Sequence, residues 1–430
     1  MKICGKRAFD LLSRLSFERL GGSPEELKAA DILVAELAEI GLSGVKEPFE
    51  IDSYKIQKAK LTITEPYQAE YIVTGYGLTG NTPETGLEAE LLYVQELTEV
   101  DLQNAAGKIV LINGRVSLES YTKLAKAKPA GMIVISGNVY DNIEDTDLQH
   151  FSIRPGYFKY GKIPGVTIRA MDALDLLQRE ACRAKIELQQ DEYKATSQNV
   201  VVDIPGTAYP DELIVFTAHY DSVVFSAGSN DNGAGSVILM EMVRYFNEHK
   251  PARSLRFIWC GSEEIGLLGS FAYVKDHQDE LDKIKLNVNV DVGGGYIGNN
   301  VTIVTAPADT MGVIDFICKE MGVAMRLRHD VYSSDSVPFA EYGIPGVNFC
   351  RFGAPIHNRH DQLQYISADR LAELGEVTLE FSRRAVNASY FPVAKELPES
   401  IKKAVIKYLQ NSRGKDMDIP TALKSKPEGA

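Results

Sequence analysis

Short apolar runs alternate with amphipathic stretches through the second half of the chain, from about residue 200 onward. The apolar runs have the length of buried strands and cover residues 213–218, 255–260, 286–290, 301–305 and 347–349. Apolar residues at helical spacing predict helices at residues 235–247, 270–276, 311–321 and 368–387. Because such alternation is typical of a mainly parallel sheet covered by helices on both faces, we expect an α/β fold.

A further helix is predicted near the start of the chain. Ser23 is a suitable N-cap, Pro24 suits the first helical position, and Glu26 stands three residues after the cap, ahead of apolar residues at helical spacing. Gly41 is the predicted end of this helix. We expect the helix to pack on the α/β domain, which makes the middle of the chain an insertion.

The inserted stretch, residues 57–191, has a strand and helix pattern of its own. Apolar runs at 108–112 and 132–136 flank an amphipathic stretch, which predicts a βαβ unit. A third run at 165–168 precedes a helix predicted over 171–183. The insert is therefore expected to be a smaller, β-rich α/β domain of ordinary domain size.

These patterns divide the chain into three parts. Residues 1–56 and 192–394 form the main domain, and residues 57–191 form the insert. Residues 395–430 hold one helix, predicted at 400–409, and a tail rich in Lys, Pro and Asp that we expect to be mobile because it has no core pattern.

The predicted strands of the second half end in residues that bind metals or transfer protons. Ligands of an open parallel sheet bind beyond the carboxyl ends of its strands, so these residues are expected to meet at one edge. They are His219 and Asp221 after the first strand, Asp231 in the glycine-rich turn that follows, Glu263 and Glu264 after the second strand, Asp291 after the third, and His357 after the last.

Several carboxylates and two imidazoles at one edge need a compensating charge. Like charges raise one another's pKa, and burial adds to the cost of keeping them ionised. A divalent cation supplies the compensation, and a donor set of nitrogen and oxygen without sulfur suits zinc and would also accept manganese or cobalt. Five candidate ligands suffice for two ions only if one carboxylate bridges them, an arrangement that activates a shared water and polarises a carbonyl.

The same residues form five motifs that resemble those of the M28 family of di-zinc exopeptidases, in the order in which that family has them. The resemblance covers roughly residues 10–55 and 195–390 and implies a zinc-exopeptidase fold with a mixed, mainly parallel sheet. The motifs are His219-x-Asp221, Asn230-Asp231-Asn232-x-Ala234-Gly235, Glu263-Glu264-x-Gly266-Leu267-x-Gly269-Ser270, Asn289-x-Asp291 and Ile356-His357-x-x-x-Asp361.

The resemblance also implies a role for each candidate ligand. Carried over position by position, His219 and Asp291 hold one zinc ion, Glu264 and His357 hold the other, and Asp231 bridges the two. Spacing by itself leaves His360 as an alternative to His357, because both follow the same predicted strand.

Two further carboxylates have roles that the resemblance implies. Glu263 is the general base, and Asp221 fixes the tautomer and orientation of the first histidine ligand. The residues alone do not decide which of Glu263 and Glu264 is the base and which the ligand. The family also has a cis peptide after its bridging aspartate, which here falls between Asp231 and Asn232.

The chain departs from the family's usual pattern at two positions. Ser336 stands where many relatives have a histidine, and Ile356 stands where many have a tyrosine that assists the tetrahedral intermediate. Tyr332 is one candidate to replace that tyrosine.

The resemblance implies a metal-dependent aminopeptidase that hydrolyses N-terminal residues of peptides through a metal-bridging hydroxide, with Glu263 as general base. A carboxypeptidase or dipeptidase on the same scaffold is the main alternative, since Arg351 and Arg359 lie near His357 in the sequence and could bind a substrate carboxylate. A non-catalytic binding homologue and a glutaminyl cyclase are further alternatives. The insert resembles the protease-associated domain through residues 107–112 and 131–135, and is interpreted as a lid or substrate-selecting wall.

Composition narrows the partners and the compartment. With 46 basic and 59 acidic residues the net charge is −13, which repels nucleic acids and anionic membranes, so peptides are the expected partners. Charges scattered over the first twenty residues exclude a signal-peptide pattern, and a cytoplasmic location is expected. The five cysteines include no CxxC pair, which favours reduced thiols. The oligomeric state and the side-chain specificity are left open.

Overall fold

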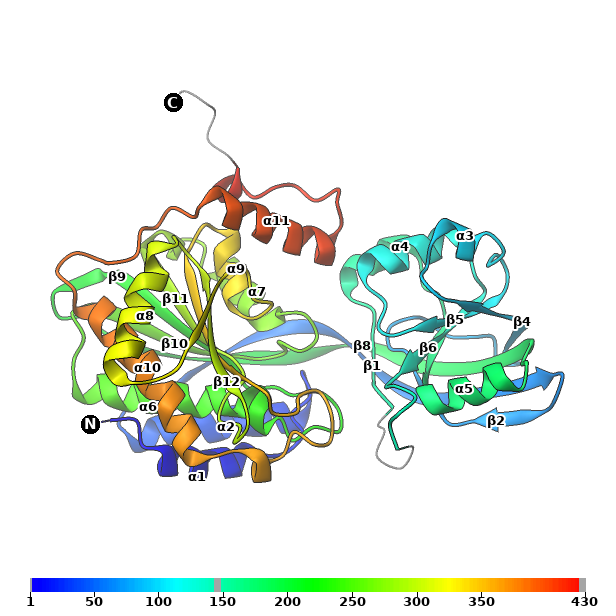
Figure 1. Cartoon of the computed structure of the whole chain (residues 1–430), viewed down its shortest axis with the longest axis horizontal. Helices are drawn as coiled ribbons and strands as arrows, with labels where there is room; N and C mark the ends of the chain where they lie inside the picture. The colour runs from blue at the N-terminus through cyan, green and yellow to red at the C-terminus, as the bar shows by residue number, and fades with distance from the viewer. Residues whose placement is uncertain (1, 143–147, 425–430) are drawn as a thin grey trace. The chain divides into compact units, whose positions relative to one another are not determined.

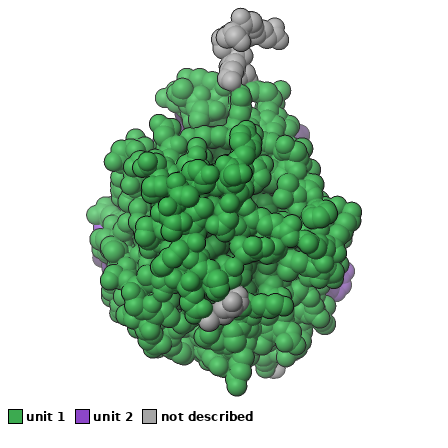
Figure 2. Space-filling model, turned by 90° about the vertical axis from the view of Figure 1, so that its left-hand side faces the viewer, with its two compact units in different colours: residues 1–51, 196–408, 418–430 green, residues 52–195, 409–417 purple. Residues whose placement is uncertain are grey.

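A computed structural model describes residues 2–142 and 148–424 (Figure 1). The chain forms two compact units, coloured separately in Figure 2: residues 1–51, 196–408 and 418–430, and residues 52–195 and 409–417. The predicted insert, residues 57–191, lies within the second unit. The C-terminal segment predicted at 395–430 is divided between the two units, and the last six residues of its predicted mobile tail lie outside the described residues.

The first unit contains a sheet in the order β13-β12-β14-β11-β9-β10-β8. The pairs β9/β10, β9/β11, β11/β14 and β12/β13 are parallel, whereas β8/β10 and β12/β14 are antiparallel, which confirms the predicted mixed, mainly parallel sheet. The strands are the part of β8 (Arg183–Ile204) from residue 196 onward, β9 (Tyr209–His219), β10 (Arg253–Cys260), β11 (Ile284–Val290), β12 (Asn299–Thr305), β13 (Arg326–His329) and β14 (Gly346–Phe352).

Helices cover both faces of this sheet. Strand β9 is buried on both sides, with Phe216 in one core and Val215 in the other, as its continuous apolar run predicts. In Figure 1, α1, α2 and α6 lie on one side of the sheet and α7 and α9 on the other. The helices of the unit are α1 (Gly5–Leu15), α2 (Pro24–Glu39), α6 (Ala234–Glu248), α7 (Leu268–Asp276), α8 (Asp309–Met321), α9 (Ser336–Glu341), α10 (Ala368–Asn387) and most of α11 (Glu399–Arg413).

The N-terminal helix prediction is confirmed by α2. The Ser23 hydroxyl accepts a hydrogen bond from the Glu26 amide at 3.1 Å, and the helix ends two residues before Gly41. Helix α1 was not predicted, although its buried residues Ala8, Leu11, Leu12 and Leu15 have helical spacing.

The second unit is built on four parallel strands, β4 to β7, with β3 added antiparallel to β7. The predicted βαβ unit is present as β5, α4 and β6. The helix predicted over 171–183 is wrong at its end: Glu180 has a φ of +53°, and Arg183 already pairs with Glu90 as a strand residue. The elements are β1 (Val45–Glu65), β2 (Ala69–Tyr71), β3 (Val73–Gly75), β4 (Leu87–Val94), α3 (Glu99–Leu102), β5 (Ile109–Asn113), α4 (Leu118–Ala127), β6 (Gly131–Ser136), β7 (Gly165–Arg169) and α5 (Ala170–Gln178).

Short 3₁₀ turns complete the secondary structure at Pro155–Tyr160, Leu281–Lys283, Leu363–Tyr365 and Thr421–Leu423. None of the helices in the described part of the chain has the length and apolar character needed to span a bilayer.

Candidate metal centre

The carboxyl ends of four strands carry the predicted site residues to one edge of the sheet. His219 is the last residue of β9, and Asp231 lies in the turn Ser229–Gly233 that leads into α6. Glu263 and Glu264 follow β10, and Asp291 follows β11 directly. His357 lies in the loop after β14. The edge is the one that a parallel sheet uses to bind ligands.

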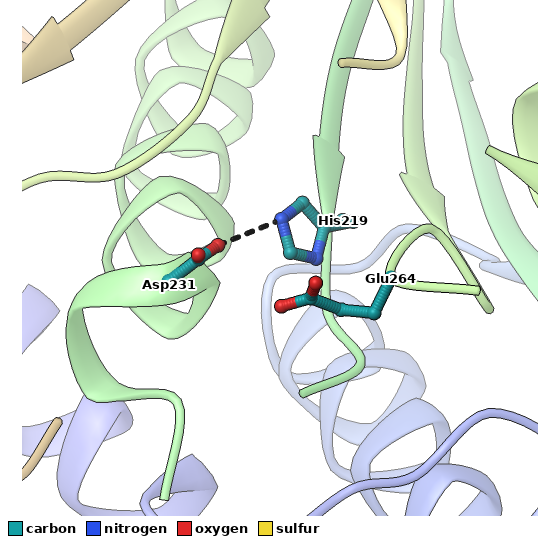
Figure 3. Close-up of side chains that lie close together, drawn as sticks. All are labelled: His219, Asp231 and Glu264. Carbon is teal, nitrogen blue, oxygen red and sulfur yellow. Dashed lines mark ion pairs between the residues drawn. The ribbon is translucent and has the colours of Figure 1, made fainter. Parts of the chain in front are cut away.

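Asp231 contacts both histidines. Its Oδ1 lies 3.1 Å from Nε2 of His219, and its Oδ2 lies 3.0 Å from Nε2 of His357. Figure 3 shows the Asp231 carboxylate directed at the His219 ring, with Glu264 on the facing loop. A single carboxylate with one oxygen toward each imidazole has the geometry of a bridging ligand.

The remaining candidates complete the cluster around these two histidines. Nε2 of His219 lies 3.3 Å from Oδ1 of Asp291 and 4.0 Å from Oε2 of Glu263. Nε2 of His357 lies 3.1 Å from Oε2 of Glu264. All the predicted ligands and the predicted base are therefore brought together.

Among the described residues, two groups of three have ligand atoms that lie within 4.8 Å of one another, and both include His219. One consists of His219, Asp231 and Glu264, and the other of His219, Glu263 and Asp291. This grouping is not the division of ligands that the family resemblance implies, in which Glu264 belongs with His357 and Glu263 is not a ligand.

Two of the carboxylate oxygens that could ligate a cation have few other partners. Oε1 of Glu264 is buried and, within the described residues, accepts no hydrogen bond, and the buried Oδ1 of Asp291 has only the His219 ring beside it, at 3.3 Å. Buried carboxylate oxygens without donors are costly unless a cation or a proton neutralises them. The nitrogen and oxygen donor set, without sulfur, suits zinc.

The pKa values of the ion-free cluster point the same way. Burial opposes charge on His219, but the Glu263 charge and hydrogen bonds to neighbouring carboxylates outweigh it and raise the pKa of His219 well above its usual value. Hydrogen bonds to Asp231 and Glu264 raise the pKa of His357 to about 11. Burial raises the pKa of Glu263. Without ions the cluster therefore holds extra protons, and bound cations would replace them.

Comparison with known proteins gives the family. The model of peptidase family M28 matches residues 199–382. Over 425 residues the chain is 30% identical to aminopeptidase YwaD of Bacillus subtilis (strain 168), covering 93% of this chain and 87% of the relative. The chain belongs to peptidase family M28. The predicted family, and with it the prediction of a peptidase, is confirmed.

The chain is also similar to a solved structure and to a further sequence. BSAP, a zinc aminopeptidase from Bacillus subtilis, has a solved structure that matches with a TM-score of 0.76 and 26% identity, over 92% of this chain and 99% of that one. Carboxypeptidase Q of Mus musculus is 28% identical over 293 residues, which cover 64% of this chain and 62% of that relative. The predicted zinc-exopeptidase fold is confirmed.

Asp221 and Asp361 support the loops of this M28 site. Asp221 lies 3.4 Å from Nδ1 of His219, longer than a usual charge-assisted hydrogen bond. Its two oxygens accept hydrogen bonds from the amides of Glu263 and Glu264 at 3.0 and 3.1 Å. Asp361 accepts from the amides of Asn230 and Asp231 at 2.6 and 3.0 Å.

The turn at Asp231 has the backbone that the family resemblance implies. The peptide between Asp231 and Asn232 is cis.

His360 and Arg351 do not join the cluster. His360 is exposed, and no distance from its ring to a site carboxylate falls within ion-pair range in the described residues. The Arg351 guanidinium donates to the Gly295 carbonyl at 2.7 Å and to Asn300 at 3.0 Å. It lines a cavity of about 460 Å³ that none of the predicted ligands lines.

Three buried charged residues near the site were not predicted to have a role there. They are Arg19, Glu26 and Asp335, all at most 1% exposed. The sequence marks Glu26 only as a helix-capping residue and gives no local signal for Arg19. For Asp335 the sequence offers one signal, the pair Ser334-Asp335 that precedes Ser336.

Proposed function

We propose that this M28 peptidase is a zinc aminopeptidase that uses two ions. The observation that carries the proposal is the position of Asp231, whose two oxygens face the two histidines at 3.1 and 3.0 Å. His219 and Asp291 would hold one ion and Glu264 and His357 the other, with Asp231 shared. The likeness to aminopeptidase YwaD and to BSAP, a zinc aminopeptidase, supports a zinc aminopeptidase.

When bound, zinc would supply a Lewis acid that polarises the substrate carbonyl and lowers the pKa of water. Glu263 takes the proton from the attacking water and delivers it to the nitrogen of the leaving amine. Its side chain is 11% exposed and lies beside the ligands, so it is reachable from solvent and screened by little water.

Many relatives have a tyrosine at the position that Ile356 occupies here, and Tyr332 takes over the role of that tyrosine. A tyrosine hydroxyl is protonated at neutral pH and can donate a hydrogen bond, and burial, followed by the charge of Asp291, raises the pKa of Tyr332 further. We place this donor at the carbonyl oxygen of the substrate, where it stabilises developing negative charge.

Carboxypeptidase activity is the second candidate because of the likeness to carboxypeptidase Q. It needs a cation to bind the substrate carboxylate. The Arg351 guanidinium is engaged by backbone and asparagine oxygens, which favours the aminopeptidase. Hydrolysis of an aminoacyl p-nitroanilide together with resistance of an N-blocked dipeptide supports the aminopeptidase, and the reverse result supports the alternative.

The direct test of the proposed base is Glu263→Gln with zinc content measured on the same preparation. We expect a loss of activity of at least about 10³-fold with zinc content unchanged, because the substitution removes proton transfer and leaves the ligands. Glu39→Gln, at an exposed position in α2, is the matched control and should retain full activity. Normal turnover by Glu263→Gln would overturn the assignment.

The inserted unit remains a predicted protease-associated domain that selects substrates by size. Deletion of residues 57–191 with unchanged relative cleavage of long and short peptides would contradict this role. The cytoplasmic location also stays a prediction.

A further inference from the structure

The segment between α1 and α2 together with the first turn of α2, here called the N-terminal link (residues 16–26), contacts two of the loops that carry the candidate ligands. Two of its charged side chains are buried, Arg19 and Glu26, each at 0% exposed. A buried ionisable side chain needs several hydrogen bonds to offset its desolvation, so the partners of these side chains indicate what they do.

Arg19 binds the loop between His219 and Asp231. Its guanidinium donates to the Tyr220 carbonyl at 2.5 Å, the Ala227 carbonyl at 2.6 Å and the Gly228 carbonyl at 3.0 Å. It also donates to two carbonyls of its own segment, Leu15 and Phe17. A single side chain thus fixes both ends of the loop 220–228.

The backbone of Arg19 strengthens this attachment. The Arg19 amide donates to the Ser222 hydroxyl at 2.9 Å, and the Ser222 amide donates back to the Arg19 carbonyl at 3.1 Å. At the far end of the loop Gly228 has a φ of +55°, and a Cβ there would lie 2.7 Å from Nη2 of Arg19. The loop that begins beside Asp221 and leads to Asp231 is therefore shaped around this arginine.

Glu26 binds the second loop, the one that follows β10. Its Oε1 accepts hydrogen bonds from the Ser262 amide and the Ser197 hydroxyl, both at 2.9 Å. Its Oε2 accepts from the Gly22 amide at 2.7 Å. Because Asp221 accepts from the next two amides, three consecutive amides, of residues 262 to 264, are held by two carboxylates.

From these contacts we infer that Arg19 and Glu26 are positioning residues for the metal centre. Arg19 sets the loop from which Asp221 and Asp231 project, and Glu26 sets the loop from which Glu263 and Glu264 project. Neither side chain contacts a candidate ligand atom in the described contacts, so both act through backbone. This inference rests on the proposed function, because it assigns the two residues to the same zinc site.

The simpler alternative is that both residues only fasten the N-terminal helices to the unit. That task has other anchors. Arg7 in α1 forms two hydrogen bonds of 2.6 Å with Glu241 of α6, and the Cys4 amide binds the same carboxylate at 2.9 Å. Arg7→Met therefore weakens the attachment of α1 without touching either loop, and is the matched control for Arg19→Met.

The test uses the full-length protein with Arg19→Met, Arg19→Lys, Glu26→Gln and Arg7→Met. Zinc affinity is measured on the ion-free proteins by competition with a chromogenic chelator. The values of kcat and KM are measured with an aminoacyl p-nitroanilide, and the melting temperature shows that each variant is folded at the assay temperature.

We expect Arg19→Met to lower zinc affinity and kcat by about 10- to 100-fold with KM changed less than about threefold, the usual effect of removing a group that orients ligands. Arg19→Lys keeps the charge but has fewer donors, so it should lie between wild type and Arg19→Met. Glu26→Gln has one acceptor oxygen in place of two, so either the Ser262 amide or the Gly22 amide loses its acceptor, and kcat should fall about 10-fold. Arg7→Met should lower the melting temperature and leave zinc affinity and kcat within about twofold of wild type, as expected when the site is untouched.

Zinc affinity and kcat of Arg19→Met that match those of Arg7→Met would overturn the inference. If Arg19→Met does not fold, Arg19→Lys decides: values within twofold of wild type would overturn it as well. Failure of the proposed function is seen separately, as wild-type protein that binds no zinc or cleaves no aminoacyl amide.

Discussion

The substitution Asp221→Asn tests how the M28 site is held together. Each carboxylate oxygen of Asp221 accepts one backbone hydrogen bond, from Glu263 at 3.0 Å and from Glu264 at 3.1 Å. An asparagine has a single acceptor oxygen, so one of these amides would face an NH₂ group. Leaving a buried donor unsatisfied costs about 1–3 kcal/mol. We expect the free energy of unfolding to fall by that amount.

The same change should reach the chemistry. One of the two glutamates loses the hydrogen bond that fixes its backbone, and His219 loses the negative charge beside Nδ1. Groups that orient metal ligands are typically worth about 10- to 100-fold in metal affinity or activity, so kcat/KM should fall by that factor.

Urea unfolding followed by tryptophan fluorescence measures the stability term, because Trp259, the only tryptophan, is buried on β10 of the same unit. Asp203→Asn is the matched control. Asp203 also accepts two hydrogen bonds, from Arg256 at 2.7 and 2.8 Å, but its side chain is 55% exposed, and surface ion pairs contribute about 0–1 kcal/mol. If Asp221→Asn loses no more stability or kcat/KM than Asp203→Asn, the reasoning about the two amides is wrong.

Three further predictions concern the oxyanion, the ions and pH. Tyr332→Phe should lower kcat about 10²-fold, as loss of an oxyanion donor does, while Tyr390→Phe at an 88% exposed position should have no effect; equal kcat values would exclude the proposed donor. Chelation should lower both activity and the melting temperature, and zinc should restore both, since a ligand at 100 times its Kd stabilises by about 2.7 kcal/mol; a melting temperature indifferent to chelation would contradict a zinc site. In ion-free protein, burial raises the pKa of Asp335 to about 7, so this group stabilises the fold below pH 4 and that contribution is lost as the pH rises to 7. In Asp335→Asn the free energy of unfolding, measured with urea, should therefore change less between pH 4 and 7 than in the wild type. An unchanged pH profile would count against the shift.

The sequence predicted the strands and the site residues for a common physical reason. In the parallel sheet, apolar runs buried on both faces are easy to recognise, and the residues that follow each run lie at the ligand-binding edge. His219, Glu263 and Asp291 were found in this way. Helix α5 was drawn too long because Glu180, with a φ of +53°, is not a residue type that marks a helix end.

What could not be predicted depends on contacts between residues far apart in the chain. Arg19 binds a carbonyl 209 positions away, and no periodicity or motif records such a contact. The position of Glu26 in the sequence is explained by helix capping alone, because its amide donates to the Ser23 hydroxyl, so nothing in the sequence indicates its contact with the loop. Local pattern gives the type of element, whereas the partner of a buried charge is set by the tertiary structure.

The site also shows why counting acidic residues does not give the number of ligands. Three carboxylates near the cluster accept hydrogen bonds from backbone amides: Asp361 from Asn230 and Asp231, Asp221 from Glu263 and Glu264, and Glu26 from Ser262. An oxygen that already accepts from an amide has less electron density to offer a cation, and its position is fixed by the loop it binds. The unbound oxygens of Glu264 and Asp291 have no such partner in the described residues. The proposed supports are therefore carboxylates that backbone amides hold, whereas the proposed ligands Glu264 and Asp291 are carboxylates that the backbone leaves free.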